Sequence, residues 1–307
     1  MKMMMKRMVA LGCTVAWLFA TACGEPPREK KVLVIGIDGV RPDVLAEVNT
    51  PNIDALIADG MFADDIESKA QTISGPGWSS MVIGAWPDKH LVTNNDFTGN
   101  QYADYPDFLT RLELVKPEFS TFAVLDWPPL GTTMSGGPLF SDTIDAKLNF
   151  NGEEGGYEAA DAASVAAAVR YLSNQDPDAA FVYIGNPDVA AHDTGVSPEY
   201  RRSIEVADTQ VGELIAALRS RPTYDEEDWL ILVSTDHGHK DEGGHGGESP
   251  EERTVFYLAS GPSALKGYPD AAPNLVDIAV TAMAHLGVEA DPAWQLDGKV
   301  VGLKGRN

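Results

Sequence analysis

Five short runs of apolar, largely β-branched residues recur along the chain and constrain its fold more than any other feature. The first, residues 31–37 (KVLVIGI), has no polar residue after its leading lysine, which is typical of a strand buried on both faces of a parallel sheet. The other runs are residues 121–125, 179–184, 229–234 and 255–259. Helical patterns lie between or after them at residues 52–59, 78–83, 157–172, 198–218 and 275–286. This order predicts an α/β fold with a mostly parallel sheet and helices on both faces.

The first 22 residues have the order of a bacterial secretion signal. Lys2, Lys6 and Arg7 precede an apolar run over residues 8–20, and Ala-Thr-Ala stands directly before Cys23. The apolar run is shorter than the roughly 20 residues that a membrane-spanning helix needs. We therefore interpret residues 1–22 as a lipoprotein signal peptide and Cys23 as the lipidated first residue of the mature protein. The alternative is an ordinary signal peptide with an incidental cysteine.

The domain organisation follows from this signal. Residues 23–31 are expected to form a tether and residues 32–307 one catalytic domain, in which residues 88–156 are a possible insertion that shapes a substrate pocket. The lipid anchor would be the sole membrane contact and would place the protein in the bacterial cell envelope, at the outer membrane facing the periplasm. Cys13 leaves with the signal and Cys23 is acylated, so we expect no disulfide, and the 44% hydrophobic composition must supply an ordinary core.

The charge excludes one class of partner. Losing the three basic residues of the signal leaves 20 basic against 46 acidic residues, a formal charge of −26. Such a surface repels anionic polymers, so binding to duplex nucleic acid is not expected. No sequence feature indicates an oligomeric state.

Aspartates and histidines follow the predicted strands, where a parallel sheet carries its functional groups. They are Asp38 after the first strand, Asp188 and His192 after the third, Asp236 and His237 after the fourth, and His245 shortly beyond. Any one of them taken alone could be a helix cap or a buried structural group. Six on consecutive loops indicate a metal site instead, and mixed oxygen and nitrogen ligands suit zinc, with manganese or cobalt as alternatives.

Ser74 stands directly before the helical pattern that reaches residue 83. Its position fits a helix N-cap, with Pro76 in the first turn. The same position places its hydroxyl beside free backbone N–H groups that favour a bound phosphate, and a metal ion would activate it as a nucleophile. Gly75 and Gly77 would keep side chains out of the path of an approaching phosphorus atom.

The ordered set of motifs resembles the type I phosphodiesterase and nucleotide pyrophosphatase family of the alkaline phosphatase superfamily. The resemblance covers residues 32–301 and rests on VIGIDG at 34–39, TPNI at 50–53, the segment from Ser74 through GAWP at 84–87, the stretch from Asp188 to His192, STDHG at 234–238, and His245.

This resemblance implies a metal-dependent phosphoric ester hydrolase with two Zn²⁺ ions. The implied ligands are Asp38, Ser74, Asp236 and His237 for one ion, and Asp188, His192 and His245 for the other. Ser74 would attack phosphorus and form a phosphoseryl intermediate, which water then hydrolyses. Two divalent ions against three carboxylates leave a local charge of about +1, which would attract a small phosphate ester despite the acidic surface.

Several points stay open from the sequence. The nucleophile turn holds no amide side chain, so the Gly75 N–H is the candidate substrate contact, alone or with a side chain from elsewhere. It holds no arginine either, which favours phosphodiesters over dianionic monoesters. A sulfatase, a phosphomonoesterase or phosphonate hydrolase, and an inactive metal-binding surface lipoprotein are the alternatives. His239 is either a partner of the metal ligands or a solvated loop residue, and the acidic run at 225–228 is expected to be a solvated turn.

Overall fold

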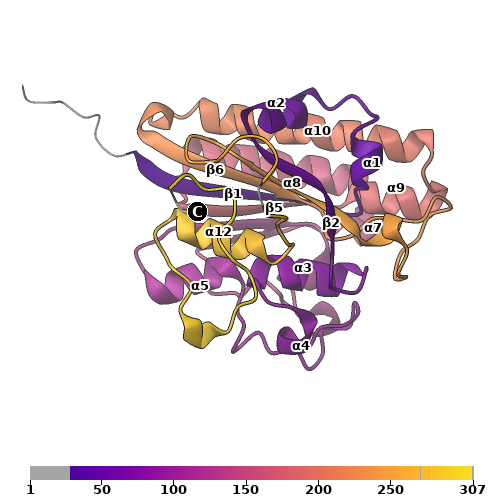
Figure 1. Cartoon of the computed structure of the whole chain (residues 1–307), viewed down its shortest axis with the longest axis horizontal. Coiled ribbons are helices and arrows are strands. Elements are labelled where there is room, and N and C mark those ends of the chain that lie inside the picture. The colour runs from indigo at the N-terminus through magenta and orange to yellow at the C-terminus, as the bar shows by residue number, and fades with distance from the viewer. Residues whose placement is uncertain (1–27, 270, 306–307) are drawn as a thin grey trace, which may run out of the picture.

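The computed structural model describes residues 28–269 and 271–305, and these form one seven-stranded sheet with helices on both faces (Figure 1). The strand order is β2-β7-β6-β1-β5-β3-β4, and the strands are β1 Glu29–Ile37, β2 Gly60–Glu67, β3 Thr121–Leu125, β4 Ala146–Asn149, β5 Ala179–Ile184, β6 Glu227–Ser234 and β7 Thr254–Ser260. The five strands from β6 to β4 run parallel, whereas β7 is antiparallel to β6 and to β2. The predicted α/β class is therefore confirmed.

The helices divide into two layers (Figure 1). They are α1 Pro42–Leu45, α2 Pro51–Asp59, α3 Ser74–Ile83, α4 Pro87–His90, α5 Phe108–Val115, α6 Pro128–Gly131, α7 Gly152–Gly155, α8 Tyr157–Asn174, α9 Asn186–Thr194, α10 Pro198–Arg219, α11 Pro250–Arg253 and α12 Asp277–His285, with short 3₁₀ turns at Met134–Gly136, Tyr224–Glu226 and Pro292–Trp294. Helices α3, α5 and α12 cover one face of the sheet, and α1, α2, α8, α9 and α10 cover the other.

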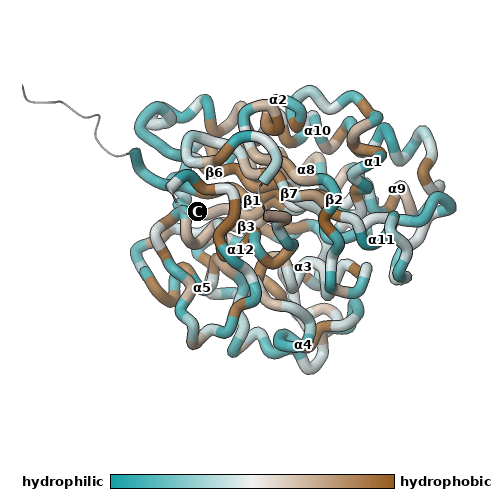
Figure 2. The backbone as a smooth tube through the Cα atoms, viewed as in Figure 1, coloured by the Kyte–Doolittle hydropathy of each residue, from teal (hydrophilic) through white to brown (hydrophobic). Residues whose placement is uncertain are grey.

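Strand β1 shows why the sheet is buried on both faces. Successive side chains of a strand point to opposite faces. Val32 and Val34 accordingly join the apolar cluster under α3 and α12, while Leu33 and Ile35 join the cluster under α8 and α10. Each of these side chains is fully buried, and Figure 2 shows the apolar residues gathered in the central strands. The continuous apolar run read from the sequence is therefore a consequence of two helix layers.

Two predicted boundaries differ from the structure. Residues 29–31, expected in the tether, belong to β1, because the buried Lys31 is held by Asp176 at 3.1 Å and by Asp178 at 3.7 Å. The segment 88–156 is not a separate insertion, since β3 and β4 pair within the same sheet. The predicted signal peptide and Cys23 lie outside the described residues. Within the described part of the chain, no helix has the length and apolar character needed to cross a membrane.

Candidate functional site

The carboxyl ends of three adjacent parallel strands deliver the predicted metal ligands to one edge of the sheet. Asp38 follows β1, Asp236 follows β6, and α9 begins just after β5 and carries Asp188 and His192. The structure brings the six predicted residues together in two groups, Asp38 with Asp236 and His237, and Asp188 with His192 and His245, and a third group of Asp188, His237 and His239 shares a residue with each of them. Within each group the potential ligand atoms lie within 4.8 Å of one another.

The first group surrounds the ring of His237. Its Nε2 atom lies 3.6 Å from Asp38 Oδ1, 3.3 Å from Asp236 Oδ2 and 3.2 Å from the Ser74 hydroxyl. Asp38 Oδ1 and Asp236 Oδ2 are buried and have no hydrogen-bond partner among the described residues. Buried polar atoms are normally paired, so two unpaired oxygens that face one imidazole nitrogen and one hydroxyl indicate a site suited to a cation.

The other oxygen of each carboxylate holds the group in place. Asp38 Oδ2 accepts hydrogen bonds from Trp78 Nε1 at 2.9 Å and from the Tyr183 hydroxyl at 2.6 Å. Asp236 Oδ1 accepts from the backbone N–H of Gly39 at 3.4 Å. Each carboxylate therefore uses one oxygen to bind the protein and turns the second toward His237, which is the arrangement expected of oriented metal ligands.

The second group is centred on Asp188. Its Oδ1 lies 3.6 Å from His192 Nε2 and 3.5 Å from His245 Nε2, and the two imidazole nitrogens are 2.9 Å apart. His245 Nδ1 lies 2.8 Å from the carbonyl oxygen of Thr72. Since a carbonyl only accepts, Nδ1 carries the proton and Nε2 presents its lone pair to the group.

Both groups have the dimensions of a divalent-ion site. Tetrahedral ligands at the usual zinc distances of about 2.0–2.1 Å are separated from one another by about 3.3–3.4 Å. The measured separations, from 2.9 to 3.6 Å, scatter around that value. The spacing within each group is therefore compatible with a bound divalent ion.

The electrostatics of the site favour cation binding. Burial, followed by the neighbouring charge of Asp38, raises the pKa values of Asp188 and Asp236 well above the ordinary range. Burial lowers the pKa of His237 far below its usual value and that of His245 to about 3, so both imidazoles are neutral. Three crowded carboxylates among neutral imidazoles repel one another, and divalent cations would relieve this repulsion.

Ser74 is the first residue of α3 rather than its N-cap. The N-cap position is occupied by Ile73, and Ser74 makes no capping hydrogen bond. The N-cap prediction was therefore wrong by one residue, because the Ser74 hydroxyl turns toward His237 instead of the helix N–H groups. Gly77 lets this helix pack against the metal-ligand segment, since a Cβ atom there would lie 2.8 Å from the Cβ of Asp236.

Asn95 is a residue of this site that the sequence analysis missed. Its Oδ1 accepts a hydrogen bond from the Gly75 N–H at 2.7 Å, so the predicted substrate-binding N–H is already engaged. The Asn95 amide nitrogen has no hydrogen-bond partner among the described residues. The side chain thus brings a free donor to the nucleophile turn. No sequence signal marked it, because Asn95 lies in an irregular loop 21 positions after Ser74.

His239 is buried and bound to the second group. Its side chain is fully shielded from solvent, and its Nε2 lies 2.9 Å from Asp188 Oδ1. A side chain on Gly39 would come within 2.6 Å of that nitrogen, so the glycine makes room for the ring. Of the two interpretations of His239, the structure supports a partner of the metal ligands over a solvated loop residue.

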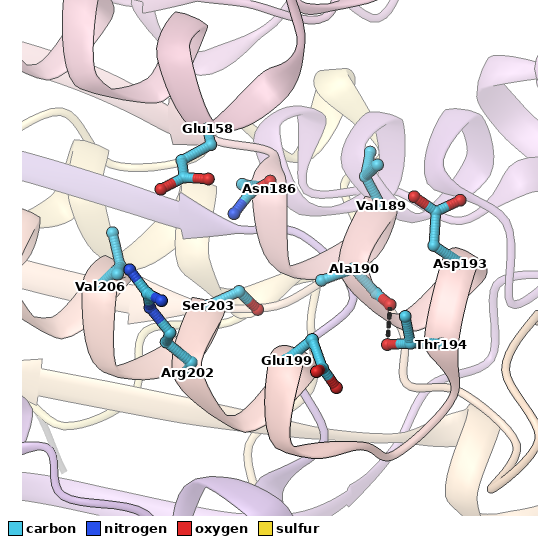
Figure 3. Close-up of a pocket in the computed structure, with 10 residues that line it drawn as sticks. All are labelled: Glu158, Asn186, Val189, Ala190, Asp193, Thr194, Glu199, Arg202, Ser203 and Val206. Carbon is cyan, nitrogen blue, oxygen red and sulfur yellow. Dashed lines mark hydrogen bonds between the residues drawn. The ribbon is translucent and has the colours of Figure 1, made fainter.

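Other residues near the site are structural. Tyr102 donates or accepts a 2.7 Å hydrogen bond with the Ser79 hydroxyl, and Trp127 packs 5.8 Å from the ring of Phe97. Another face of α9 borders a pocket of about 330 Å³ between α8, α9 and α10, which is lined by Glu158, Asn186, Val189, Ala190, Asp193, Thr194, Glu199, Arg202, Ser203 and Val206 (Figure 3). None of the predicted site residues lines this pocket.

The sequence is similar to those of a known protein family. A profile of the type I phosphodiesterase / nucleotide pyrophosphatase family matches residues 32–252. Human ectonucleotide pyrophosphatase/phosphodiesterase family member 7 is 23% identical over 255 residues, covering 75% of this chain and 53% of that protein. The bis(5'-adenosyl)-triphosphatase of Bos taurus is 22% identical over 236 residues, covering 71% and 49%. The chain thus spans about half the length of the curated relatives it matches.

Solved structures share the fold. Murine ectonucleotide pyrophosphatase/phosphodiesterase 5, in an inactive form in complex with AMP, matches with a TM-score of 0.67 at 18% identity, over 86% of this chain and 96% of that chain. A 2-O glycosaminoglycan sulfatase matches with a TM-score of 0.65 at 14% identity, over 89% and 73%. At these identities the matches establish a common architecture.

Proposed function

Since the chain belongs to the type I phosphodiesterase / nucleotide pyrophosphatase family, a family of metal-dependent phosphoric ester hydrolases, we propose that it hydrolyses phosphodiester or pyrophosphate bonds with Ser74 as the nucleophile. The observation that carries the proposal is the pair of unpaired, buried oxygens of Asp38 and Asp236 beside His237 and the Ser74 hydroxyl. The substrate class is that of a small nucleotide ester, as in the relative named a bis(5'-adenosyl)-triphosphatase.

Two zinc ions would bind in the two groups described. Asp38, Ser74, Asp236 and His237 would hold one, and Asp188, His192 and His245 the other. When bound, the ions supply positive charge that stabilises the Ser74 alkoxide, a hydrolytic water molecule and the phosphoryl oxygens. Manganese or cobalt would meet the same ligand chemistry.

Ser74 and Asn95 carry out the remaining steps, which are nucleophilic attack and binding of the phosphate group. Ser74 Oγ attacks phosphorus in line with the leaving oxygen, so that a serine–phosphate bond forms as the ester bond breaks. Water then attacks the phosphoserine and regenerates Ser74. The free amide donor of Asn95 would bind a non-bridging phosphate oxygen, with its orientation set by the hydrogen bond from the Gly75 N–H.

A diester fits the charges around the site better than a monoester. The guanidinium of Arg41, which donates to the His239 carbonyl oxygen at 3.2 Å, is committed to Asp43 at 2.7 Å and to Asp241 at 2.6 Å. Lys240 faces Glu252 at 3.7 Å. A dianionic monoester would lack the extra cation that usually accompanies it, whereas a diester carries one negative charge fewer.

The test is a matched kinetic comparison of the zinc-loaded protein on bis-p-nitrophenyl phosphate, p-nitrophenyl phosphate and p-nitrophenyl sulfate. Diester cleavage should dominate, and Ser74→Ala should lower it by about three orders of magnitude while the protein still binds metal. Ser80→Ala, on the same helix but bonded to His90 at 3.1 Å, is the control and should retain activity. Preference for the sulfate ester would establish the sulfatase alternative, and no turnover in metal-loaded protein would establish the inactive scaffold.

The proposed location is the bacterial envelope, with Cys23 lipidated and the domain facing the periplasm. This part of the chain lies outside the described residues, so its support is the signal-like sequence alone. Metabolic labelling with a fatty acid should mark the wild-type protein. A Cys23→Ala precursor that is labelled equally would contradict the assignment.

A further inference from the structure

Helix α9 begins without a cap of its own. It carries Asp188 and His192, so its position sets the geometry of the second metal group. Its N-cap residue, Gly185, offers no side chain, and the first N–H groups of a helix have no partner within the helix. Any group that binds these N–H groups therefore controls where the ligand-bearing helix starts.

Asp161, from the first turns of α8, binds the start of α9. Its carboxyl group is buried, its Oδ1 accepts from the Gly185 N–H at 2.8 Å, and its Oδ2 accepts from the Asn186 N–H at 2.9 Å. Two bonds from one rigid carboxylate fix both the position and the direction of the helix start. A negative charge at a helix N-terminus is also favoured by the helix dipole.

A second buried carboxyl group, that of Asp126, contacts Asp161. Asp126 follows β3 directly and is fully buried, and its carboxyl group contacts the carboxyl group of Asp161 and the hydroxyl of Ser164. Two buried carboxyl groups in contact cannot both be ionised, so they share one proton. Burial, then the charge of Asp161, raises the pKa of Asp126 well above its usual range.

The groups around Asp126 also favour its protonated form. Asp38 adds a further negative charge nearby, and the hydroxyls of Tyr157 and Tyr183 are neutral because burial raises their pKa values. Asp161 already accepts two N–H donors, which stabilises its ionised form. Asp126 is therefore the protonated member of the pair.

We propose that Asp126 and Asp161 form a carboxylic acid–carboxylate pair that positions α9, and with it Asp188 and His192. Asp126 donates its proton to Asp161, and Asp161 in turn holds the first N–H groups of α9. Both are positioning residues. The proposal rests on the proposed function only in taking Asp188 and His192 as metal ligands.

The test compares Asp161→Asn with the same chemical change at its neighbour, Asp126→Asn. An asparagine at 126 still donates an N–H to Asp161, so zinc affinity, measured by competition with a chelator, should stay within about twofold of wild type. An asparagine at 161 turns an NH₂ group toward an N–H donor, so affinity for the second ion should fall about 10- to 100-fold. Equal losses in both variants, or no loss in Asp161→Asn, would overturn the proposal.

A second measurement does not depend on the folding of Asp161→Asn. Infrared difference spectra of wild type against Asp126→Asn at neutral pH should show the C=O band of a protonated carboxyl group in the wild type alone. Absence of that band would refute the shared proton. Wild-type protein that binds two ions but hydrolyses none of the substrates would refute the proposed function and leave the acid pair intact.

Discussion

Replacement of Asn95 by alanine tests the assignment of the phosphate contact. The hydrogen bond from the Gly75 N–H to Asn95 Oδ1, at 2.7 Å, identifies which end of the amide faces the nucleophile turn. The NH₂ group is then the free end, and alanine removes both the acceptor for Gly75 and the donor for substrate.

The expected losses in catalysis and stability differ in size. One donor to a charged transition-state oxygen is worth about 10²- to 10³-fold in kcat, or about 3–4 kcal/mol. The stability loss should be about 1 kcal/mol, because Asn95 is exposed and makes one neutral hydrogen bond. The assay is therefore kcat and KM on a diester, with denaturant unfolding measured in parallel.

Asn95→Asp is the matched variant that separates the two roles. Aspartate keeps an acceptor for the Gly75 N–H but replaces the donor with a negatively charged oxygen that repels the substrate. We expect its kcat to be as low as that of Asn95→Ala or lower. If Asn95→Asp retains more than half of the wild-type activity, the residue only holds the turn and the proposed phosphate contact is wrong.

Three further changes should have distinct effects. Gly77→Ala places a Cβ atom 2.8 Å from the Cβ of Asp236 and should lower the number of zinc ions bound per protein. Gly155→Ala, at a position with open space around it, is the control and should leave that number unchanged, as measured by metal analysis of the purified proteins. His239→Leu should weaken zinc binding about 10- to 100-fold, while His239→Gln, which keeps a donor, should largely restore it. Burial opposes ionisation of Glu227, but the hydrogen bonds from buried Arg221 outweigh burial and lower the pKa of Glu227. The stabilisation from this ion pair is therefore present at neutral pH and lost as pH falls through the folded-state pKa of Glu227. Glu227→Gln should lower the free energy of unfolding by about 3 kcal/mol at pH 7, and its difference from wild type should shrink below about pH 4. Denaturant unfolding at both pH values measures this difference, and a difference that stayed constant would contradict the reasoning.

The secondary structure that the sequence predicted is the part buried on both faces. Strands β1, β3, β5, β6 and β7 have continuous apolar runs because helices cover both sides of them. The edge strands β2 and β4 were missed, since β2 carries exposed aspartates at 64 and 65 and β4 is partly exposed throughout. An edge strand is selected by pairing with its neighbour, and pairing leaves little trace in hydrophobicity.

The acidic run at 225–228 shows the limit of reading charge from sequence. It was expected to be a solvated turn, but Glu227 and Asp228 are buried at the start of β6. Arg221 binds Glu227 through a 2.8 Å contact, and Lys30 binds Asp228 at 2.9 Å. These two carboxylates can be buried because Arg221 and Lys30, which lie outside the acidic run, supply the opposite charge.

The sequence by itself determined the α/β class and the family, and it predicted the seven nucleophile and metal-site residues, because those residues follow strand ends within motifs of a few positions. The tertiary structure alone decided which groups orient them. Asn95 reaches Gly75 across 20 positions, Asp161 reaches Gly185 across 24, and His239 reaches Asp188 across 51. Local sequence reports side-chain chemistry and periodicity, whereas a hydrogen bond between distant segments depends on where the packed sheet and helices place both partners.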